Sequence, residues 1–119
     1  MTITPAILVV EDEPLISMMI EDFLEALGYR LAGTADAVDQ ALDLVRQGGF
    51  DAALLDVNLR DGQASWPVAD ALAAQGRPFV IATGGSNDSV PDRHAGVPVL
   101  GKPYTMDGIR AAFETLLAA

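Results

Sequence analysis

Short apolar runs recur along the chain and alternate with stretches of helical periodicity. The runs that we expect to form strands are Ala6–Val10, Arg30–Thr34, Ala52–Leu55, Phe79–Ala82 and Val97–Gly101. Most of them are almost continuously apolar, which is typical of strands covered on both faces, and only the second run is weaker. Strand-like runs that alternate with helical patterns predict βαβ units and a parallel sheet.

Apolar residues at helical spacing fill the intervals between these runs. After the first run, one face of a helix is predicted by Ile16, Ile20, Phe23 and Leu27. Asp36 is expected to cap a second helix, and Trp66–Gln75 is expected to form a third. Thr105 is expected to cap a final helix whose inward face carries Ile109 and Phe113.

The interval Gly84–Gly96 departs from this alternation of strand-like and helical stretches. It contains three glycines and Pro91, a composition typical of a loop with room for one or two helical turns. The fourth helix is therefore expected to be short or irregular. His94, the only histidine of the chain, is expected to face solvent in this segment.

Four of the apolar runs end in a polar group that can take part in phosphoryl chemistry. Glu11 and Asp12 follow the first run, and Asp56 follows the third. Thr83 follows the fourth, and Lys102, the only lysine, follows the fifth. Because parallel strands end at one edge of the sheet, where such sheets bind ligands, we expect these groups to converge.

The composition excludes several classes of partner. The 119 residues carry a formal charge of −10 with a pI near 4.1, which argues against nucleic acid and against anionic membranes. There is no cysteine, and the N-terminal residues lack the features of a signal peptide. We expect a soluble cytoplasmic protein in which residues 1–119 form a single domain.

Four motifs, taken in order, give the chain a resemblance to a known family. Leu8–Glu13, Leu54–Leu59, Ile81–Gly84 and Leu100–Pro103 resemble the motifs of the receiver domain of two-component response regulators. The resemblance covers nearly the whole chain. It implies an α/β fold, a doubly wound five-stranded parallel sheet of flavodoxin-like order 2-1-3-4-5, with helices on both faces.

The resemblance also implies a site for Mg²⁺ and a phosphoryl group. Asp12 and Asp56 would bind Mg²⁺ directly, Glu11 would bind it through water, and the backbone carbonyl of Asn58 would add an oxygen. Asp56 would be the phosphoacceptor, because a carboxylate can attack phosphorus and form an acyl phosphate. Two further residues would contact the phosphoryl oxygens, namely Thr83 and Lys102.

The function implied is that of a phosphoacceptor switch rather than of an enzyme. The donor would be a phosphohistidine on a sensor histidine kinase or on a histidine phosphotransfer protein. The output would pass to an unidentified downstream protein, and the domain would hydrolyse its own acyl phosphate.

Val99 stands where many receivers have an aromatic residue, and Tyr104 follows the Lys-Pro pair as in a divergent alphaproteobacterial subgroup.

Two other functions would use a related arrangement of strands. A phosphatase of the haloacid dehalogenase type needs a second Asp two residues after its nucleophile, and Asn58 stands at that position. A flavin-binding module of flavodoxin type needs a phosphate loop after the first strand. The three carboxylates of Glu11, Asp12 and Glu13 stand there and would repel such a phosphate.

Overall fold

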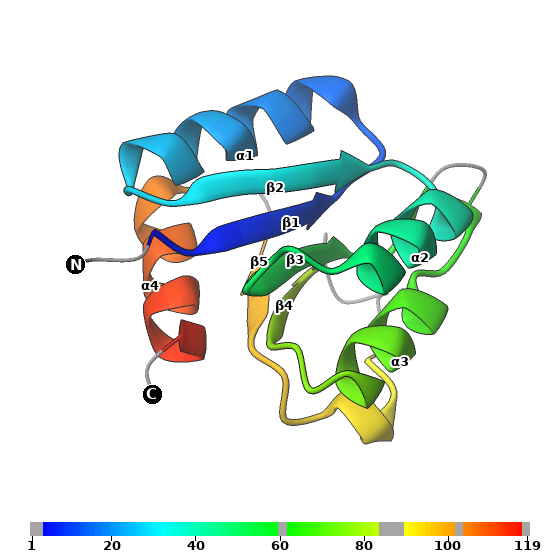
Figure 1. The fold of residues 1–119 in the computed structure, drawn as a ribbon. Helices are drawn as coiled ribbons and strands as arrows, with labels where there is room; N and C mark the ends of the chain where they lie inside the picture. The colour runs from blue at the N-terminus through cyan, green and yellow to red at the C-terminus, as the bar shows by residue number, and fades with distance from the viewer. Residues whose placement is uncertain (1–3, 60–61, 84–89, 102–103, 118–119) are drawn as a thin grey trace.

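The computed structural model describes residues 4–59, 62–83, 90–101 and 104–117, and within them five strands form one sheet (Figure 1). The strands are β1 (Ala6–Val10), β2 (Arg30–Ala35), β3 (Ala52–Asp56), β4 (Phe79–Thr83) and β5 (Val99–Gly101). Their order is β2-β1-β3-β4-β5 and every neighbouring pair is parallel. The predicted sheet and its order are confirmed.

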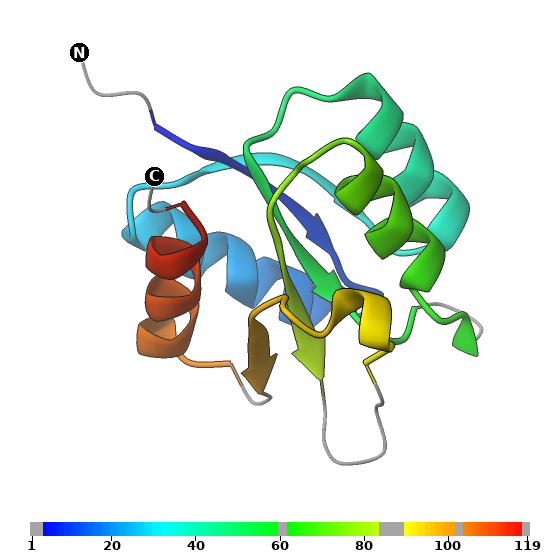
Figure 2. The ribbon, with the colours of Figure 1, turned by 90° about the horizontal axis from the view of Figure 1, so that it is seen from below.

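Helices cover both faces of the sheet, two on each side (Figures 1 and 2). The described helices are α1 (Pro14–Ala26), α2 (Val38–Gln47), α3 (Trp66–Ala74) and α4 (Met106–Leu117). Helices α1 and α4 pack on one face and α2 and α3 on the other. This arrangement confirms the doubly wound fold.

Apolar side chains of alternating sheet residues form a separate core on each face. On the α1 and α4 side, Ile20, Leu24 and Phe113 pack against β1 and β3. On the α2 and α3 side, Val45 and Leu72 pack against the opposite faces of the same strands. Because β1 and β3 are covered on both faces, all of their residues are buried, as the continuous apolar runs predicted.

The start of α4 shows the predicted cap. The Thr105 hydroxyl accepts a hydrogen bond from the backbone N–H of Gly108 at 3.0 Å, which satisfies a donor that the first turn leaves without a helical partner. A Cβ atom at position 108 would lie 3.0 Å from that hydroxyl and 3.3 Å from Leu100. Glycine therefore lets the first turn of α4 approach β5 closely.

The start of α2 differs from the prediction. Ala37 rather than Asp36 is the residue that precedes the helix, and no side-chain hydrogen bond caps it. The backbone N–H of Asp36 instead donates to the Gln40 side chain at 3.0 Å. The expected cap lies one residue too early because the strand β2 extends to Ala35 and the chain turns over two residues.

The connection between β4 and β5 contains one 3₁₀ turn, η2 (Asp92–His94), where a full helix would normally lie. This agrees with the expected short or irregular fourth helix. Residues 84–89 of this connection lie outside the described part of the chain.

The prediction for His94 was wrong. Its ring is buried, stacks on Trp66 with ring centroids 6.2 Å apart, and meets the edge of Phe79 at 5.8 Å. The loop-like composition around it gave no sign of this burial, since the two aromatic partners come from α3 and β4.

None of the helices in the described ranges is long and apolar enough to cross a membrane.

Candidate functional site at the carboxyl edge of the sheet

The strand ends bring the predicted site residues to one edge of the sheet. Asp56 is the last residue of β3, and its Cα pairs with that of Ala82 in β4. Glu11 follows directly after β1, and its backbone N–H donates to the carbonyl of Ala35 at the end of β2, at 2.9 Å. The pairing of parallel strands therefore places both carboxylates at the same edge, as the sequence predicted.

Three carboxylates meet at this edge. One oxygen each from Glu11, Asp12 and Asp56 lies within 4.8 Å of the others. Glu11 and Asp56 are each only 4% exposed. Burying several acidic groups together is unfavourable unless a cation or hydrogen-bond donors compensate them, so this cluster is unlike an ordinary solvated acidic surface.

Carboxylate oxygens at this spacing suit a hard divalent cation. Mg²⁺ and Ca²⁺ bind oxygen ligands, and Mg²⁺ is usually held by a few carboxylates together with water. Among the described residues, this group of possible ligands is made of carboxylate oxygens alone, and the chain has no cysteine. The residues present therefore fit the metal that the sequence pattern implies.

Backbone hydrogen bonds join the described residues on either side of positions 60–61, after β3. Asn58 forms an isolated antiparallel bridge with Ala64, and the N–H of Ser65 donates to the carbonyl of Val57 at 2.9 Å. Leu59, whose N–H donates to the carbonyl of Gln63, is buried in the core on the α2 and α3 face. The backbone around Asn58 is therefore held next to Asp56, as a carbonyl ligand would require.

The phosphoryl-contacting residues predicted from the sequence lie on the neighbouring strands. Thr83 ends β4, and its Cα pairs with that of Gly101, the last residue of β5. Lys102, the next residue along the chain, lies outside the described residues. The structure thus places Thr83 at the same edge as Asp56, and the position of Lys102 stays a prediction.

A tyrosine that the sequence did not connect with the acids also reaches them. Tyr104 is 6% exposed, and its hydroxyl donates a hydrogen bond to Oε1 of Glu11 at 3.3 Å. Burial raises the pKa of Tyr104 far above its usual value, and the charges of Glu11, Asp56 and Glu13 raise it further. The only sequence signal for this contact is the aromatic residue two positions after Lys102.

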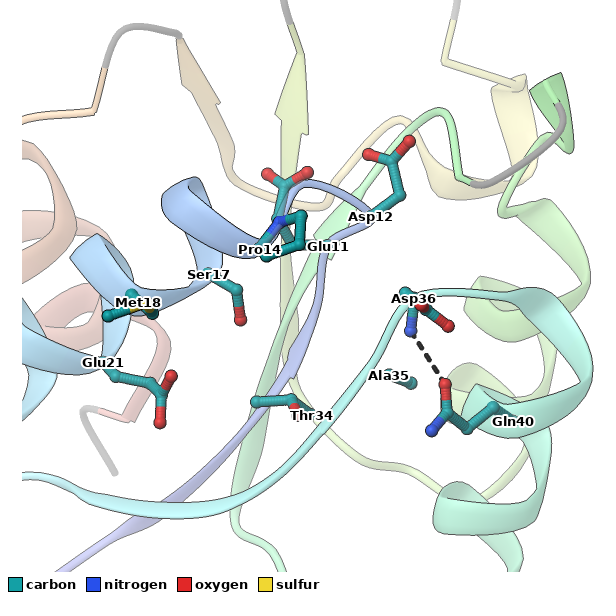
Figure 3. A pocket seen from close by; sticks show the side chains of 10 residues that line it. All are labelled: Glu11, Asp12, Pro14, Ser17, Met18, Glu21, Thr34, Ala35, Asp36 and Gln40. Carbon is teal, nitrogen blue, oxygen red and sulfur yellow. Dashed lines mark hydrogen bonds between the residues drawn. The ribbon is translucent and has the colours of Figure 1, made fainter.

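A cavity of about 310 Å³ opens beside the acid pair, between the start of α1 and the end of β2 (Figure 3). In this view the carboxylates of Glu11 and Asp12 point to the same side, away from Thr34 and Gln40. Asp56 and Thr83 are not part of the cavity wall. The cavity therefore borders the carboxylate cluster without being the cluster itself.

Two apolar side chains of α1 are exposed close to this edge. Leu15 is 79% exposed and Met18 is 58% exposed, and Met18 also lines the cavity. The inward face of α1 instead carries Ile20 and Leu24, which are buried.

The chain matches a known family over most of its length. The family model for the response regulator receiver domain matches residues 7–113. No curated protein sequence matches the chain.

Solved structures show the same fold. The solution structure of SdrG from Sphingomonas melonis Fr1 is 58% identical, covers 99% of this chain and 100% of its own, and superposes with a TM-score of 0.87. The BeF3-activated conformation of SdrG has the same identity and coverage, with a TM-score of 0.82. The receiver domain of Erythrobacter litoralis PhyR is 28% identical over 96% of this chain and 90% of its own, with a TM-score of 0.78.

Proposed function

Because this chain belongs to the response regulator receiver domain family, we propose that Asp56 accepts a phosphoryl group in a Mg²⁺-dependent reaction. One observation carries the proposal: oxygens of Glu11, Asp12 and Asp56 lie within 4.8 Å of one another at the carboxyl edge of the sheet. The comparisons give no support to a phosphatase of the haloacid dehalogenase type.

Four residues would hold the metal in this proposal. Asp12 and Asp56 would bind Mg²⁺ through their carboxylates, Glu11 through water and Asn58 through its backbone carbonyl. The bound cation would supply positive charge against which an anionic nucleophile and an anionic phosphoryl group can approach each other. The bridge between Asn58 and Ala64 and the hydrogen bond from Ser65 to Val57 support this assignment, because they hold the Asn58 backbone beside the end of β3.

The transfer step follows from the chemistry of the carboxylate. An oxygen of Asp56 forms a bond to phosphorus while the bond between phosphorus and the donor's imidazole nitrogen breaks. The nitrogen keeps the electron pair of that bond, and because the other ring nitrogen of the donor's phosphohistidine carries a proton, the imidazole leaves in its neutral form. The Thr83 hydroxyl and the Lys102 ammonium would bind the phosphoryl oxygens, so that positioning and charge do most of the work.

The donor and the output are proteins in this proposal. A sensor histidine kinase or a histidine phosphotransfer protein in the cytoplasm would supply the phosphohistidine. The phosphorylated form would be recognised by a downstream protein, and water would later hydrolyse the acyl phosphate within the same domain. The BeF3-activated state of SdrG, 58% identical to this chain, supports the idea of a second, phosphoryl-dependent conformation.

The test is phosphorylation by a small-molecule donor. With acetyl phosphate and Mg²⁺, the intact mass should rise by one phosphoryl group in the wild type and not in Asp56→Asn. Chelating the metal should abolish labelling, and the label should disappear with time once the donor is removed. Labelling of Asp56→Asn to the wild-type extent would overturn the assignment of the phosphoacceptor.

A matched control separates loss of the nucleophile from loss of charge. Asp107→Asn removes one acidic group from an exposed position in α4, where Asp107 pairs with Arg110 at 2.9 Å. This variant should be labelled like the wild type. Loss of labelling in both variants would show that overall charge rather than Asp56 decides the reaction.

A further inference from the structure

Tyr104 joins two parts of the molecule that are 93 positions apart in sequence. Its hydroxyl donates to Oε1 of Glu11 at 3.3 Å, across the carboxyl edge of the sheet. The chain has only one other tyrosine, Tyr29, which packs against Phe113 with ring centroids 5.7 Å apart. Tyr104 is therefore the only tyrosine hydroxyl bonded to a residue of the carboxylate cluster.

The position of the Tyr104 ring is set by packing rather than by its hydrogen bond. The residue is 6% exposed and belongs to the apolar core that includes Leu100, Ile109 and Phe113. A ring enclosed by β5 and α4 has little freedom to follow a moving partner. The hydroxyl is therefore a fixed point to which Glu11 adapts.

The Glu11 carboxylate is bonded through both of its oxygens. Oε1 accepts from Tyr104, and Oε2 accepts from the backbone N–H of Glu13 at 3.3 Å, just before α1 begins. Two donors on different elements restrict the rotation of this side chain. In this orientation a Glu11 oxygen lies within 4.8 Å of the carboxylates of Asp12 and Asp56.

We propose that Tyr104 is a positioning residue for the metal site, holding the Glu11 carboxylate in its metal-facing orientation before Mg²⁺ binds. This inference rests on the proposed function, because it assumes that the cluster binds Mg²⁺. Outer hydrogen bonds of this kind orient metal ligands, and their loss commonly weakens metal binding tenfold or more. A neutral hydroxyl can orient the Glu11 carboxylate without adding a positive charge that would compete with the cation.

The hydroxyl remains a donor over the whole physiological range. Burial, followed by the charges of Glu11 and Asp56, raises the pKa of Tyr104 far above its ordinary value. A tyrosine in this environment does not ionise at neutral pH.

The test compares Tyr104→Phe with the matched control Tyr29→Phe. Each variant loses one hydroxyl and keeps its ring, so both should fold, as thermal melting would verify. Titration calorimetry with MgCl₂ should show a Kd about tenfold higher for Tyr104→Phe than for the wild type, and an unchanged Kd for Tyr29→Phe. Labelling by acetyl phosphate should need more Mg²⁺ in Tyr104→Phe but reach the wild-type extent at saturation.

A double-mutant cycle distinguishes positioning through Glu11 from a general structural effect. If Tyr104 acts through Glu11, Tyr104→Phe should not weaken Mg²⁺ binding any further in a Glu11→Ala background. Additive effects of the two substitutions, or a wild-type Kd for Tyr104→Phe, would overturn the inference. If the wild type itself bound no Mg²⁺ and took no label, the proposed function would fail instead.

Discussion

Nε2 of His94 lies 2.8 Å from Oδ1 of Asp70, so the β4–β5 connection is bonded to α3. Arg93, the preceding residue, binds the same carboxylate through Nε at 2.7 Å and through a terminal nitrogen at 3.2 Å. The hydrogen bond from Arg93, followed by that from His94, lowers the pKa of Asp70. One carboxylate of α3 thus binds two successive residues of η2 in the β4–β5 connection.

The imidazole contributes more to stability than the ion pair does. His94→Ala removes a buried ring that contacts Trp66 and Phe79. We expect this substitution to lower the free energy of unfolding by about 2–4 kcal/mol. Asp70 is 48% exposed, so Asp70→Asn, which keeps an acceptor, should cost under about 1 kcal/mol. Urea denaturation measures both values, and a larger cost for Asp70→Asn would contradict this ranking.

A surface pair supplies the control for that comparison. Asp43 and Arg46 form an ion pair one turn apart on α2, with side chains 60% and 69% exposed. Because solvent screens such a pair, Asp43→Ala should change the free energy of unfolding by no more than about 0.5 kcal/mol. If Asp43→Ala lowered the free energy of unfolding as much as His94→Ala does, the measurement would not distinguish buried from exposed positions.

The cap of α4 has a measurable effect on stability. Thr105→Ala removes the acceptor for the Gly108 N–H, and we expect a loss of about 1 kcal/mol. Thr115→Ala, at an exposed position within the same helix, should be neutral or slightly stabilising because alanine is the better helix former. Equal losses in the two variants would argue against the cap.

Tyr104 should make the protein sensitive to alkali. Its pKa is raised in the folded state, whereas an unfolded tyrosine titrates near a pH of about 10. Below that pH the tyrosine is protonated in both states, so its ionisation does not lower the free energy of unfolding. Above it the unfolded state loses the proton first, and stability falls as pH rises. From pH 8 to about pH 11 the wild type should lose about 1.4 kcal/mol more than Tyr104→Phe.

Urea unfolding at a series of pH values measures this difference. The pKa of Tyr29 is also raised, by partial burial and by the charge of Glu114. Tyr29→Phe should therefore flatten the alkaline profile less than Tyr104→Phe does, since Tyr104 is the more buried of the two. Parallel profiles for the wild type and Tyr104→Phe would contradict the raised pKa.

The exposed apolar side chains of α1 should matter for partners and not for folding. Replacing Leu15 and Met18 together by Ser should change the free energy of unfolding by no more than about 0.5 kcal/mol, because both are mostly exposed. Labelling by acetyl phosphate should be unaffected. We expect transfer from a phosphorylated histidine kinase to slow down, because exposed apolar side chains beside the carboxylates are candidate contacts for a protein partner.

A remote apolar residue is the control for this docking experiment. Leu31 is 36% exposed and lies near the start of β2, at the opposite end of the sheet from the carboxylates. Leu31→Ser should leave the transfer rate from the kinase unchanged. If the α1 double variant also transferred at the wild-type rate, this surface would not be the kinase contact.

The pattern of apolar runs was enough to predict the sheet and the edge at which the carboxylates meet. A strand covered on both faces is apolar along most of its length, so Ala6–Val10 and Ala52–Leu55 are visible in the sequence as uninterrupted runs. Parallel pairing then forces the residues that follow, Glu11 and Asp56, to the same side. Neither inference needs knowledge of side-chain contacts.

The tertiary structure decided which polar residues are buried and what they touch. His94 was expected in solvent because it lies in a segment of loop-like composition, yet Trp66 and Phe79 cover it. The contact of Tyr104 with Glu11 likewise joins residues 93 positions apart. Burial is the sum of contacts from elements that only the fold brings together, whereas strand periodicity is a local property that the sequence itself determines.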